Sequence, residues 1–168
     1  MKLKHINKLS NIELAYIAGF LDGDGSIMAQ IVKNKSYKYG HTIRVTVSFY
    51  QKTKRHWFMI KLRKLLGKEW SIRKRNDGIS EVYQTGFTPI KNFLIVIKPF
   101  LILKPRLALL ILQIIEEYSQ VQSEADFLEV CKKIDKTAEY TDSKKRIHTY
   151  SSVKKYLNSP VETEKYNI

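Results

Sequence analysis

Near the start of the chain, hydrophobic residues recur at helical spacing and predict an amphipathic helix. The residues on its apolar face are Leu14, Ile17, Ala18 and Leu21. Ser10, with Glu13 three residues later, forms a capping-box pattern that places the start of the helix near Asn11. The helix runs into Asp22-Gly23-Asp24-Gly25, a string of turn-forming residues that ends it.

Alternating apolar and polar residues after this helix predict two pairs of strands. The four strands are predicted over residues 26–33, 42–51, 70–75 and 79–87. Asn76-Asp77-Gly78, between the last two, is a strong signal for a tight hairpin turn. In the second strand, the residues that must face the core are Ile43, Val45, Val47 and Phe49. An antiparallel sheet with one apolar face and one polar face follows.

Helical spacing returns in the segments between and after these strands. The further helices are predicted over residues 52–66, 90–97, 105–118, 126–138 and 151–157. Gly67 can close the first of them, and Pro89 and Pro105 lie at the first turns of the next two.

The order of these elements is α-β-β-α-β-β-α, followed by C-terminal helices. This order predicts an α+β fold in which helices cover one face of a four-stranded antiparallel sheet. No repeat or linker divides the sequence, so residues 1–168 are predicted to form a single domain. Its core covers about residues 10–140, and residues 141–168 form a C-terminal loop and helix.

The composition favours a polyanionic partner. The chain has 30 Lys and Arg residues against 16 Asp and Glu residues, which gives a formal net charge of +14. An excess of this size is typical of proteins that bind nucleic acid, and an anionic membrane surface is the alternative. The most apolar stretch, residues 93–115, is interrupted by charged residues and prolines, so no membrane span is expected.

The single cysteine, Cys131, excludes an intramolecular disulfide and is predicted to be a buried thiol in a reducing compartment. Residues 1–5 lack the apolar segment of a secretory signal, so secretion is not expected. The abundance of Lys, Ile, Asn and Tyr hints at an A+T-rich genome. The localisation stays open between an organelle, chloroplast or mitochondrion, and a prokaryotic cytoplasm.

The acids at the end of the first helix indicate a metal site. Asp22 and Asp24 lie where the helix dipole and the unpaired carbonyls already carry partial negative charge, so they lower the stability of the helix. Carboxylates beside free carbonyl oxygens, spaced by Gly23 and Gly25, form an oxygen-rich nest that suits Mg²⁺. The alternative is that these four residues are only a helix stop and a turn.

The polar face of the predicted sheet carries side chains that can read DNA. Arg, Gln and Asn form bidentate hydrogen bonds to base edges in the major groove, and basic side chains also contact phosphates. The predicted DNA contacts on this face and its loops are Met28, Gln30, Val32, Asn34, Ser36, Tyr37, Thr42, Arg44, Ser48, Tyr50, Arg73, Arg75, Glu81 and Tyr83. The alternative is an ordinary solvated sheet face.

Residues 17–25, Ile-Ala-Gly-Phe-Leu-Asp-Gly-Asp-Gly, resemble the signature of the LAGLIDADG homing endonucleases. The resemblance covers nearly the whole chain, because the family fold has the same element order, with a saddle-shaped sheet laid along DNA. Only one signature occurs, so the chain resembles the single-motif, homodimeric branch that group I introns encode. This resemblance implies a subunit interface on the signature helix, through Ala15, Ala18 and Gly19, and a near-palindromic double-stranded DNA site.

Further positions match this branch and imply the roles of its site residues. Gln51 and Arg55 fit a Gln-Lys-Thr-x-Arg pattern, and Lys104 follows a Pro-Phe-Leu sequence in the matching place. The resemblance implies Mg²⁺ or Mn²⁺ held by Asp24 and the Gly23 carbonyl, water positioning by Gln51, and charge compensation by Arg55 and Lys104. Such a set suits phosphodiester hydrolysis, which needs a positioned water and cations around the phosphate.

One further DNA contact, Lys144, lies in Asp142-Ser143-Lys144, which resembles a backbone-contacting loop of this branch. The leading expectation is therefore a homing endonuclease that cuts both strands of a long site and promotes the spread of its intron. A maturase that helps its own intron RNA to fold and a non-catalytic DNA-binding regulator are the alternatives. The presence of the four residues given catalytic roles argues against a pure binder.

Overall fold

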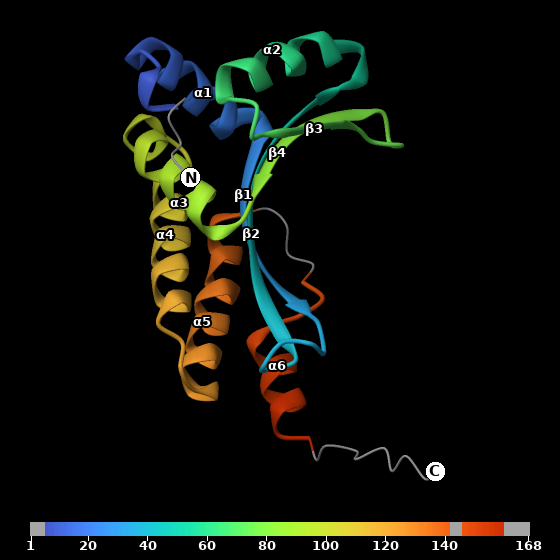
Figure 1. Ribbon diagram of the computed structural model, residues 1–168, viewed down its shortest axis with the longest axis vertical. Helices are drawn as coiled ribbons and strands as arrows, with labels where there is room; N and C mark the ends of the chain where they lie inside the picture. Colours follow the sequence, from blue (N-terminus) through green and yellow to red (C-terminus); the bar gives the residue numbers. More distant parts are fainter. Residues whose placement is uncertain (1–5, 142–145, 160–168) are drawn as a thin grey trace.

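The structure is a computed structural model that describes residues 6–141 and 146–159. The helices are α1 (Asn11–Asp24), α2 (His56–Leu66), α3 (Phe87–Ile97), α4 (Pro105–Ser119), α5 (Glu124–Lys136) and α6 (Tyr150–Leu157). The strands are β1 (Gly25–Lys33), β2 (His41–Lys52), β3 (Ser71–Lys74) and β4 (Ile79–Thr85). Short 3₁₀ turns lie at Ile6–Lys8, Thr53–Arg55, Lys98–Phe100 and Thr137–Tyr140. The predicted element order is confirmed (Figure 1).

The strands form one four-stranded antiparallel sheet in the order β1-β2-β4-β3. Its register places Ile27 of β1 opposite Val47 of β2, and Phe49 of β2 opposite Val82 of β4. All four of these side chains are buried, because the inward positions of neighbouring strands coincide on one face. The predicted α+β fold is confirmed.

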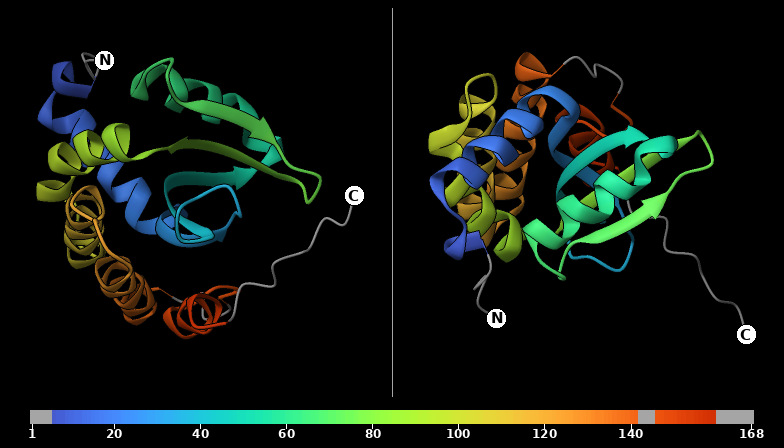
Figure 2. Two further views of the ribbon diagram at one scale, coloured as in Figure 1. Left: turned by 60° about the horizontal axis from the view of Figure 1, so that its bottom comes forward. Right: turned by 90° about the horizontal axis from the view of Figure 1, so that it is seen from above.

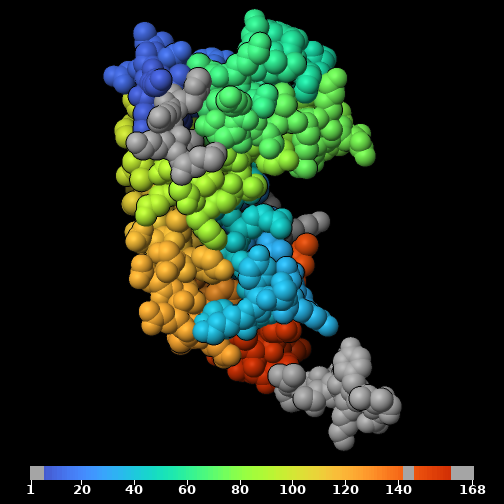
Figure 3. Space-filling view, in the orientation of Figure 1, coloured from blue at the N-terminus to red at the C-terminus, as the bar shows by residue number. Residues whose placement is uncertain are grey.

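Aromatic rings fill the core between this face and the helices. The ring of Phe49 lies 5.7 Å from that of Phe20 on α1, 5.8 Å from that of Trp70 and 6.5 Å from that of Phe93 on α3. The opposite face of the sheet is curved and open (Figure 2). In the space-filling view this side is hollowed between the β3–β4 hairpin and the β1–β2 hairpin (Figure 3). The hollow is where a long ligand can lie along the polar face.

Several element boundaries differ from those predicted. Helix α3 begins at Phe87 rather than at residue 90, because Gly86 has φ of 102° and turns the chain from β4 into the helix. Strand β3 ends at Lys74, so Arg75 lies in the hairpin turn, where its N–H donates to the carbonyl of Ile79. Helix α5 begins at Glu124, because Ser123 and Asp126 form a capping box there.

The C-terminal part of the described chain packs against the β1–β2 hairpin. Gly40 has φ of 64°, which favours glycine, and a Cβ there would lie 2.2 Å from Cε1 of Tyr156 on α6, so a side chain would displace this ring. The ring centroids of Tyr156 and His41 are 5.0 Å apart. Cys131 on α5 is fully buried, as predicted. Among the described residues, no helix is both long and apolar enough to cross a membrane.

Candidate active site and nucleic-acid interface

The end of α1 is joined to the start of α4 through the carboxylate of Asp22. This carboxylate is largely buried and accepts hydrogen bonds from the backbone N–H groups of Ile102 (2.6 Å), Leu103 (3.0 Å) and Lys104 (3.0 Å). The negative charge therefore lies at the N-terminus of α4, where a helix dipole stabilises it. The expectation that both acids form an open metal nest is wrong for Asp22, because backbone donors bind both of its oxygens.

Lys104 makes the reciprocal contact. Its ammonium donates to the carbonyl of Leu21 at 2.8 Å and to the carbonyl of Asp22. These carbonyls belong to the last turn of α1, where acceptors have no helical partner. The lysine thus places positive charge against the negative end of the helix, close to the acids that end it.

Asp24 lies on the exposed side of the same helix end. Its Oδ2 accepts a hydrogen bond from Nε2 of Gln51 at 2.7 Å, and Oε1 of Gln51 accepts one from Nη1 of Arg55 at 2.9 Å. These three side chains come from α1, β2 and the turn after β2. The structure therefore brings together, around the end of α1, the four residues to which the sequence assigns catalytic roles.

Gly25 allows this convergence, because β1 begins directly after α1 and passes close to its last turn. A Cβ at this position would lie 2.6 Å from Cδ1 and 2.9 Å from Cα of Leu21. Any side chain there would push the strand away from the helix. Strand β1 would then lose its place beside β2, which carries Gln51.

The donor atoms around Asp24 fit a hard divalent cation in part. The carboxylate of Asp24 and the carbonyl of Gly23 are oxygen ligands of the kind that Mg²⁺ prefers. Within the described part of the chain, no group of three or more His, Cys, Asp and Glu side chains could hold a metal ion. One chain thus supplies only part of a coordination shell, and water, a phosphate oxygen or the same carboxylate of a second copy must complete it.

The predicted DNA contacts fall into three classes on the open face. The exposed ones are Gln30, Asn34, Ser36, Tyr37, Arg44, Arg73 and Arg75. The partly exposed ones are Met28, Val32, Thr42, Tyr50 and Tyr83. Ser48 and Glu81 are buried, and Lys144 lies outside the described residues. Direct contact with DNA therefore stays a prediction for the first two classes and is corrected for Ser48 and Glu81.

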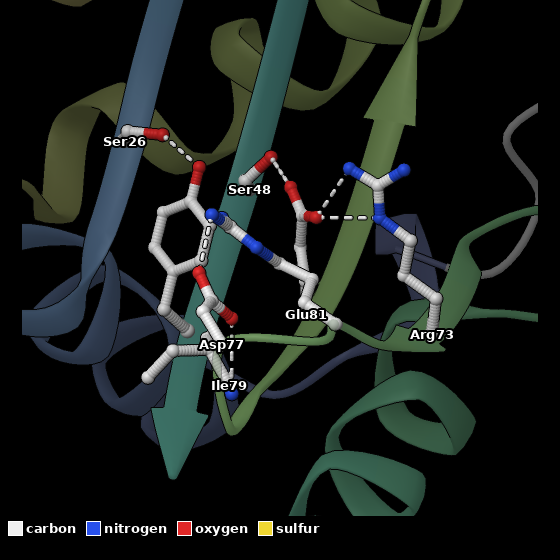
Figure 4. Close-up of polar contacts among 8 residues, drawn as sticks. Ser26, Ser48, Arg73, Asp77, Ile79 and Glu81 are labelled. Atoms are coloured by element: carbon white, nitrogen blue, oxygen red, sulfur yellow. Dashed lines mark hydrogen bonds and ion pairs between the residues drawn. The ribbon is translucent and has the colours of Figure 1, made fainter. Parts of the chain in front are cut away.

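Glu81 is occupied by its neighbours on the sheet (Figure 4). Its Oε1 accepts a hydrogen bond from the hydroxyl of Ser48 at 2.9 Å, and its Oε2 accepts one from Nε of Arg73 at 2.8 Å. The hydrogen bond and charge of Glu81 raise the pKa of Arg73. The guanidinium also lies 4.8 Å from the ring centroid of Tyr83. Glu81 thus aims Arg73 instead of presenting its own carboxylate.

Two other polar pairs order the same face (Figure 4). Arg75 forms an ion pair with Asp77 at 2.7 Å in the β3–β4 turn. The hydroxyls of Ser26 and Tyr50 lie 3.1 Å apart, across β1 and β2. Arg75 lies one residue beyond the end of β3, and Arg73 lies within that strand.

The expected subunit interface on α1 needs one correction. Ala15 and Gly19 are exposed, but Ala18 is fully buried in the core of its own chain and cannot contact a second copy. No heavy atom lies within 4 Å of the place where a Cβ of Gly19 would be. The prediction did not include Ile12 and Tyr16, whose side chains are 82% and 53% exposed on the same helix. They are spaced by four residues, so they lie side by side on the exposed surface of the helix.

A groove of about 760 Å³ runs along β1 and opens toward the end of α1. Its wall includes Asp22, Lys104 and Lys33, together with Arg146 and His148, which the sequence analysis did not select. The guanidinium of Arg146 donates to the carbonyl of Ile134 and to the hydroxyl of Thr137. Basic groups in the wall of a groove suit a phosphate backbone.

The chain is similar to known endonucleases over most of its length. The family model described as LAGLIDADG endonuclease matches residues 17–107. DNA endonuclease I-CreI of Chlamydomonas reinhardtii is 42% identical over 153 residues, which cover 90% of this chain and 93% of that protein. DNA endonuclease I-CvuI of Chlorella vulgaris is 36% identical over 146 residues, which cover 87% of this chain and 90% of that protein.

Solved structures give the same result. The crystal structure of I-CvuI with a DNA target, uncleaved in 2 mM Mg, matches with a TM-score of 0.81 and 35% identity, over 87% of this chain and 92% of that one. The archaeal intron-encoded homing endonuclease I-Vdi141I, complexed with DNA, shares the fold with a TM-score of 0.72 and 18% identity, over 88% of this chain and 95% of that one. By its sequence, its fold and the side chains gathered at the end of α1, this chain belongs to the LAGLIDADG endonuclease family.

Proposed function

We propose that this chain is a site-specific homing endonuclease that cuts both strands of a long double-stranded DNA target as a homodimer. The observation that carries the proposal is the convergence of Asp24, Gln51, Arg55 and Lys104 at the end of α1. The convergence lies beside an open, polar and basic sheet face. Two relatives that match this chain over nearly their whole length are named as DNA endonucleases.

The chemistry that these residues can perform is phosphodiester hydrolysis. A divalent cation on Asp24 and the Gly23 carbonyl would polarise the phosphate and lower the pKa of a bound water. The amide of Gln51 can orient the attacking water, because it has both a donor and an acceptor. Arg55 and Lys104 lie where they offset the negative charge that develops on the phosphate.

The oxygen-only donor set supports Mg²⁺ or Mn²⁺ as the working metal. Softer metals prefer imidazole or thiolate ligands, and among the described residues no cluster of three or more His, Cys, Asp and Glu side chains could hold a metal ion. The similar endonuclease I-CvuI is described in crystals with DNA and 2 mM Mg or 2 mM Ca. Calcium, which is larger and binds less rigidly, is a useful metal for measuring DNA binding apart from cleavage.

The homodimer follows from the half-complete site. One chain has one exposed carboxylate at this helix end and one sheet face, whereas a double-strand cut has two scissile phosphates. A two-fold axis beside α1 would bring two copies of Asp24 together and align two sheet faces along one DNA duplex. Ala15 and Gly19 allow close approach of the two helices, and the exposed Ile12 and Tyr16 supply apolar area.

Sequence recognition would come from the open face. Gln30 and Arg44 are partners across β1 and β2 and are both exposed, so they can reach adjacent base edges in the major groove. Arg73, aimed by Glu81, would read a further position in each half-site. Lys33 and Arg146, in the groove along β1, would bind phosphates and carry no sequence preference.

The decisive experiment is a cleavage assay on the intronless host locus in Mg²⁺. Wild-type protein should cut both strands at one site, and the same locus interrupted by its intron should stay intact. Binding without cutting would instead support a DNA-binding regulator. Activity on the intron RNA alone, seen as faster splicing with no cut in the DNA, would support a maturase.

A further inference from the structure

We propose that Asp22 is a positioning residue that holds Lys104 in register with Asp24. The inference rests on the proposed endonuclease function, because that function gives Lys104 its role at the phosphate. It assigns to the first acid of the Asp-Gly-Asp-Gly string a task separate from metal binding. The second acid, Asp24, keeps the metal.

The contact between Asp22 and the segment before α4 joins parts of the chain that are far apart in sequence. The three backbone donors lie 80, 81 and 82 residues from Asp22. All three bonds are charge-assisted, since a carboxylate accepts them. A cradle of three successive N–H groups around one carboxylate specifies both the position and the direction of residues 102–104.

Side-chain packing does not hold this segment. Ile102 is 86% exposed and Leu103 is 74% exposed, so neither anchors the chain in the core. Pro105, the first residue of α4, has no N–H to donate, and the side chain of the N-cap residue, Lys104, makes no capping hydrogen bond. The Asp22 carboxylate therefore holds the backbone N–H groups of this segment.

The contact between Asp22 and Lys104 is reciprocal. The side chain of Asp22 holds the main chain of Lys104, and the side chain of Lys104 binds the main-chain carbonyls of Leu21 and Asp22. If residues 102–104 shift, the ammonium of Lys104 moves relative to the end of α1. It then also moves relative to Asp24, which lies only two residues after Asp22. A misplacement of about 1 Å at a reacting centre costs about 100-fold in rate.

The test is Asp22→Asn in the full-length protein, bound to its mapped DNA target. Asn keeps one acceptor oxygen but turns an NH₂ donor toward backbone N–H groups, so part of the cradle is lost. The single-turnover cleavage rate in Mg²⁺ should fall by on the order of 10- to 100-fold. The dissociation constant in Ca²⁺ should stay within about 3-fold, because backbone N–H groups already bind both oxygens of Asp22, although this residue lies in the wall of the groove along β1.

Asp126→Asn is the matched control. On α5, Asp126 accepts hydrogen bonds from the backbone N–H groups of Gln122 (3.1 Å) and Ser123 (2.9 Å), far from the end of α1. The same chemical change there should leave the cleavage rate unchanged. A rate that falls equally in both variants would mean general destabilisation and would overturn the proposal.

A double-mutant cycle gives a readout that a purely structural role would not move. If Asp22 acts through Lys104, Asp22→Asn should add little to the loss already caused by Lys104→Ala. Fully additive losses would overturn the proposal, as would Asp22→Asn cutting within about 2-fold of the parent. Should Asp22→Asn not fold, Asp22→Glu keeps the charge but shifts the carboxylate, and parental cleavage by that variant would equally reject the idea.

Failure of this inference is distinguishable from failure of the proposed function. If the parent protein does not cut DNA, or if Asp24→Asn still does, the endonuclease proposal itself is wrong. If the parent cuts, Asp24→Asn does not, and Asp22→Asn cuts normally, only the role of Asp22 is rejected.

Discussion

Gln51 donates a hydrogen bond from its side-chain amide to the carboxylate of Asp24, with Nε2 and Oδ2 2.7 Å apart. This contact joins the end of α1 to the end of β2. It uses Oδ2 of Asp24, which is one of the two carboxylate oxygens. The amide oxygen of Gln51 is in turn bound by Arg55. One chain of hydrogen bonds therefore runs from Arg55 through Gln51 to Asp24. It orders the side chains beside the water that the site would activate.

The relationship predicts that Asp24→Asn separates binding from chemistry. Asn has nearly the shape of Asp but no charge, so metal capture and cleavage in Mg²⁺ should disappear. DNA binding in Ca²⁺ should persist or tighten, because one negative charge is removed from a polyanion interface. The melting temperature should rise slightly, since the carboxylate lies at the negative end of α1. If Asp24→Asn cleaves DNA at near the parental rate, Asp24 does not hold the metal.

Gln51→Ala should lower the cleavage rate by on the order of 100-fold, because the water loses its oriented partner. The affinity for DNA should change little. Gln113→Ala, an exposed glutamine on α4, is the control and should leave both quantities unchanged. Single-turnover rates and equilibrium binding on the same target check this prediction, and a Gln51→Ala protein as fast as the parent contradicts it.

Glu81→Gln tests whether the buried carboxylate aims Arg73. The variant loses the charge that holds the guanidinium, so discrimination at one base pair of each half-site should fall by roughly 10-fold. Overall affinity for unrelated DNA should rise, because a negative charge leaves the interface. Binding to the target and to its single-base-pair variants at one salt concentration gives both values.

The control for Glu81→Gln is Glu129→Gln on α5. Glu129 forms an ion pair with Lys132 at 2.5 Å on the surface, away from the open face. That variant should bind every target as the parent does. If Glu81→Gln lowers affinity equally for all targets, Glu81 supports the fold and does not set specificity.

Gly19→Leu should block the subunit interface without harming the single chain. The structure has open space around Gly19, and Leu favours a helix more than Gly does. The variant should fold, sediment as a monomer and lose double-strand cleavage. Ala125→Leu, at an exposed position of α5, is the control and should stay dimeric. A dimeric and fully active Gly19→Leu protein would exclude α1 as the interface.

Cys131 predicts a specific loss of stability at high pH. Burial, helped by the charge of Asp135, raises the pKa of its thiol from 9.0 to about 12. The pKa of the Cys131 thiol is higher in the folded chain than in the unfolded chain. The contribution of this thiol to the free energy of unfolding is therefore complete below pH 9.0 and is lost as the pH rises toward 12. In that range the free energy of unfolding should fall more steeply for the parent than for Cys131→Ala, by up to about 1.4 kcal/mol per pH unit. Parallel curves from urea titrations would contradict the assignment.

Periodicity along the chain determined the elements and the buried face of the sheet. The alternation from Ile43 to Phe49 has a period of two, which only a strand with one covered face satisfies. The start of α1 was predictable for the same local reason, because Ser10 and Glu13 bond to each other's backbone within one turn. The set around Asp24 needed the family resemblance, because no spacing in the sequence links residue 24 to residues 51, 55 and 104.

Only the tertiary structure decided which polar residues are free to act. Ser48 and Glu81 lie on the polar side of their strands, yet neighbouring strands bring a partner to each, and both are buried. Ala18 has the small side chain of an interface residue, but the orientation of α1 about its own axis places this side chain in the core. Asp22 and Asp24 are two residues apart in the same string, and their environments separate them. The backbone donors that bind Asp22 come from 80 residues away, a distance over which local sequence carries no information about contact.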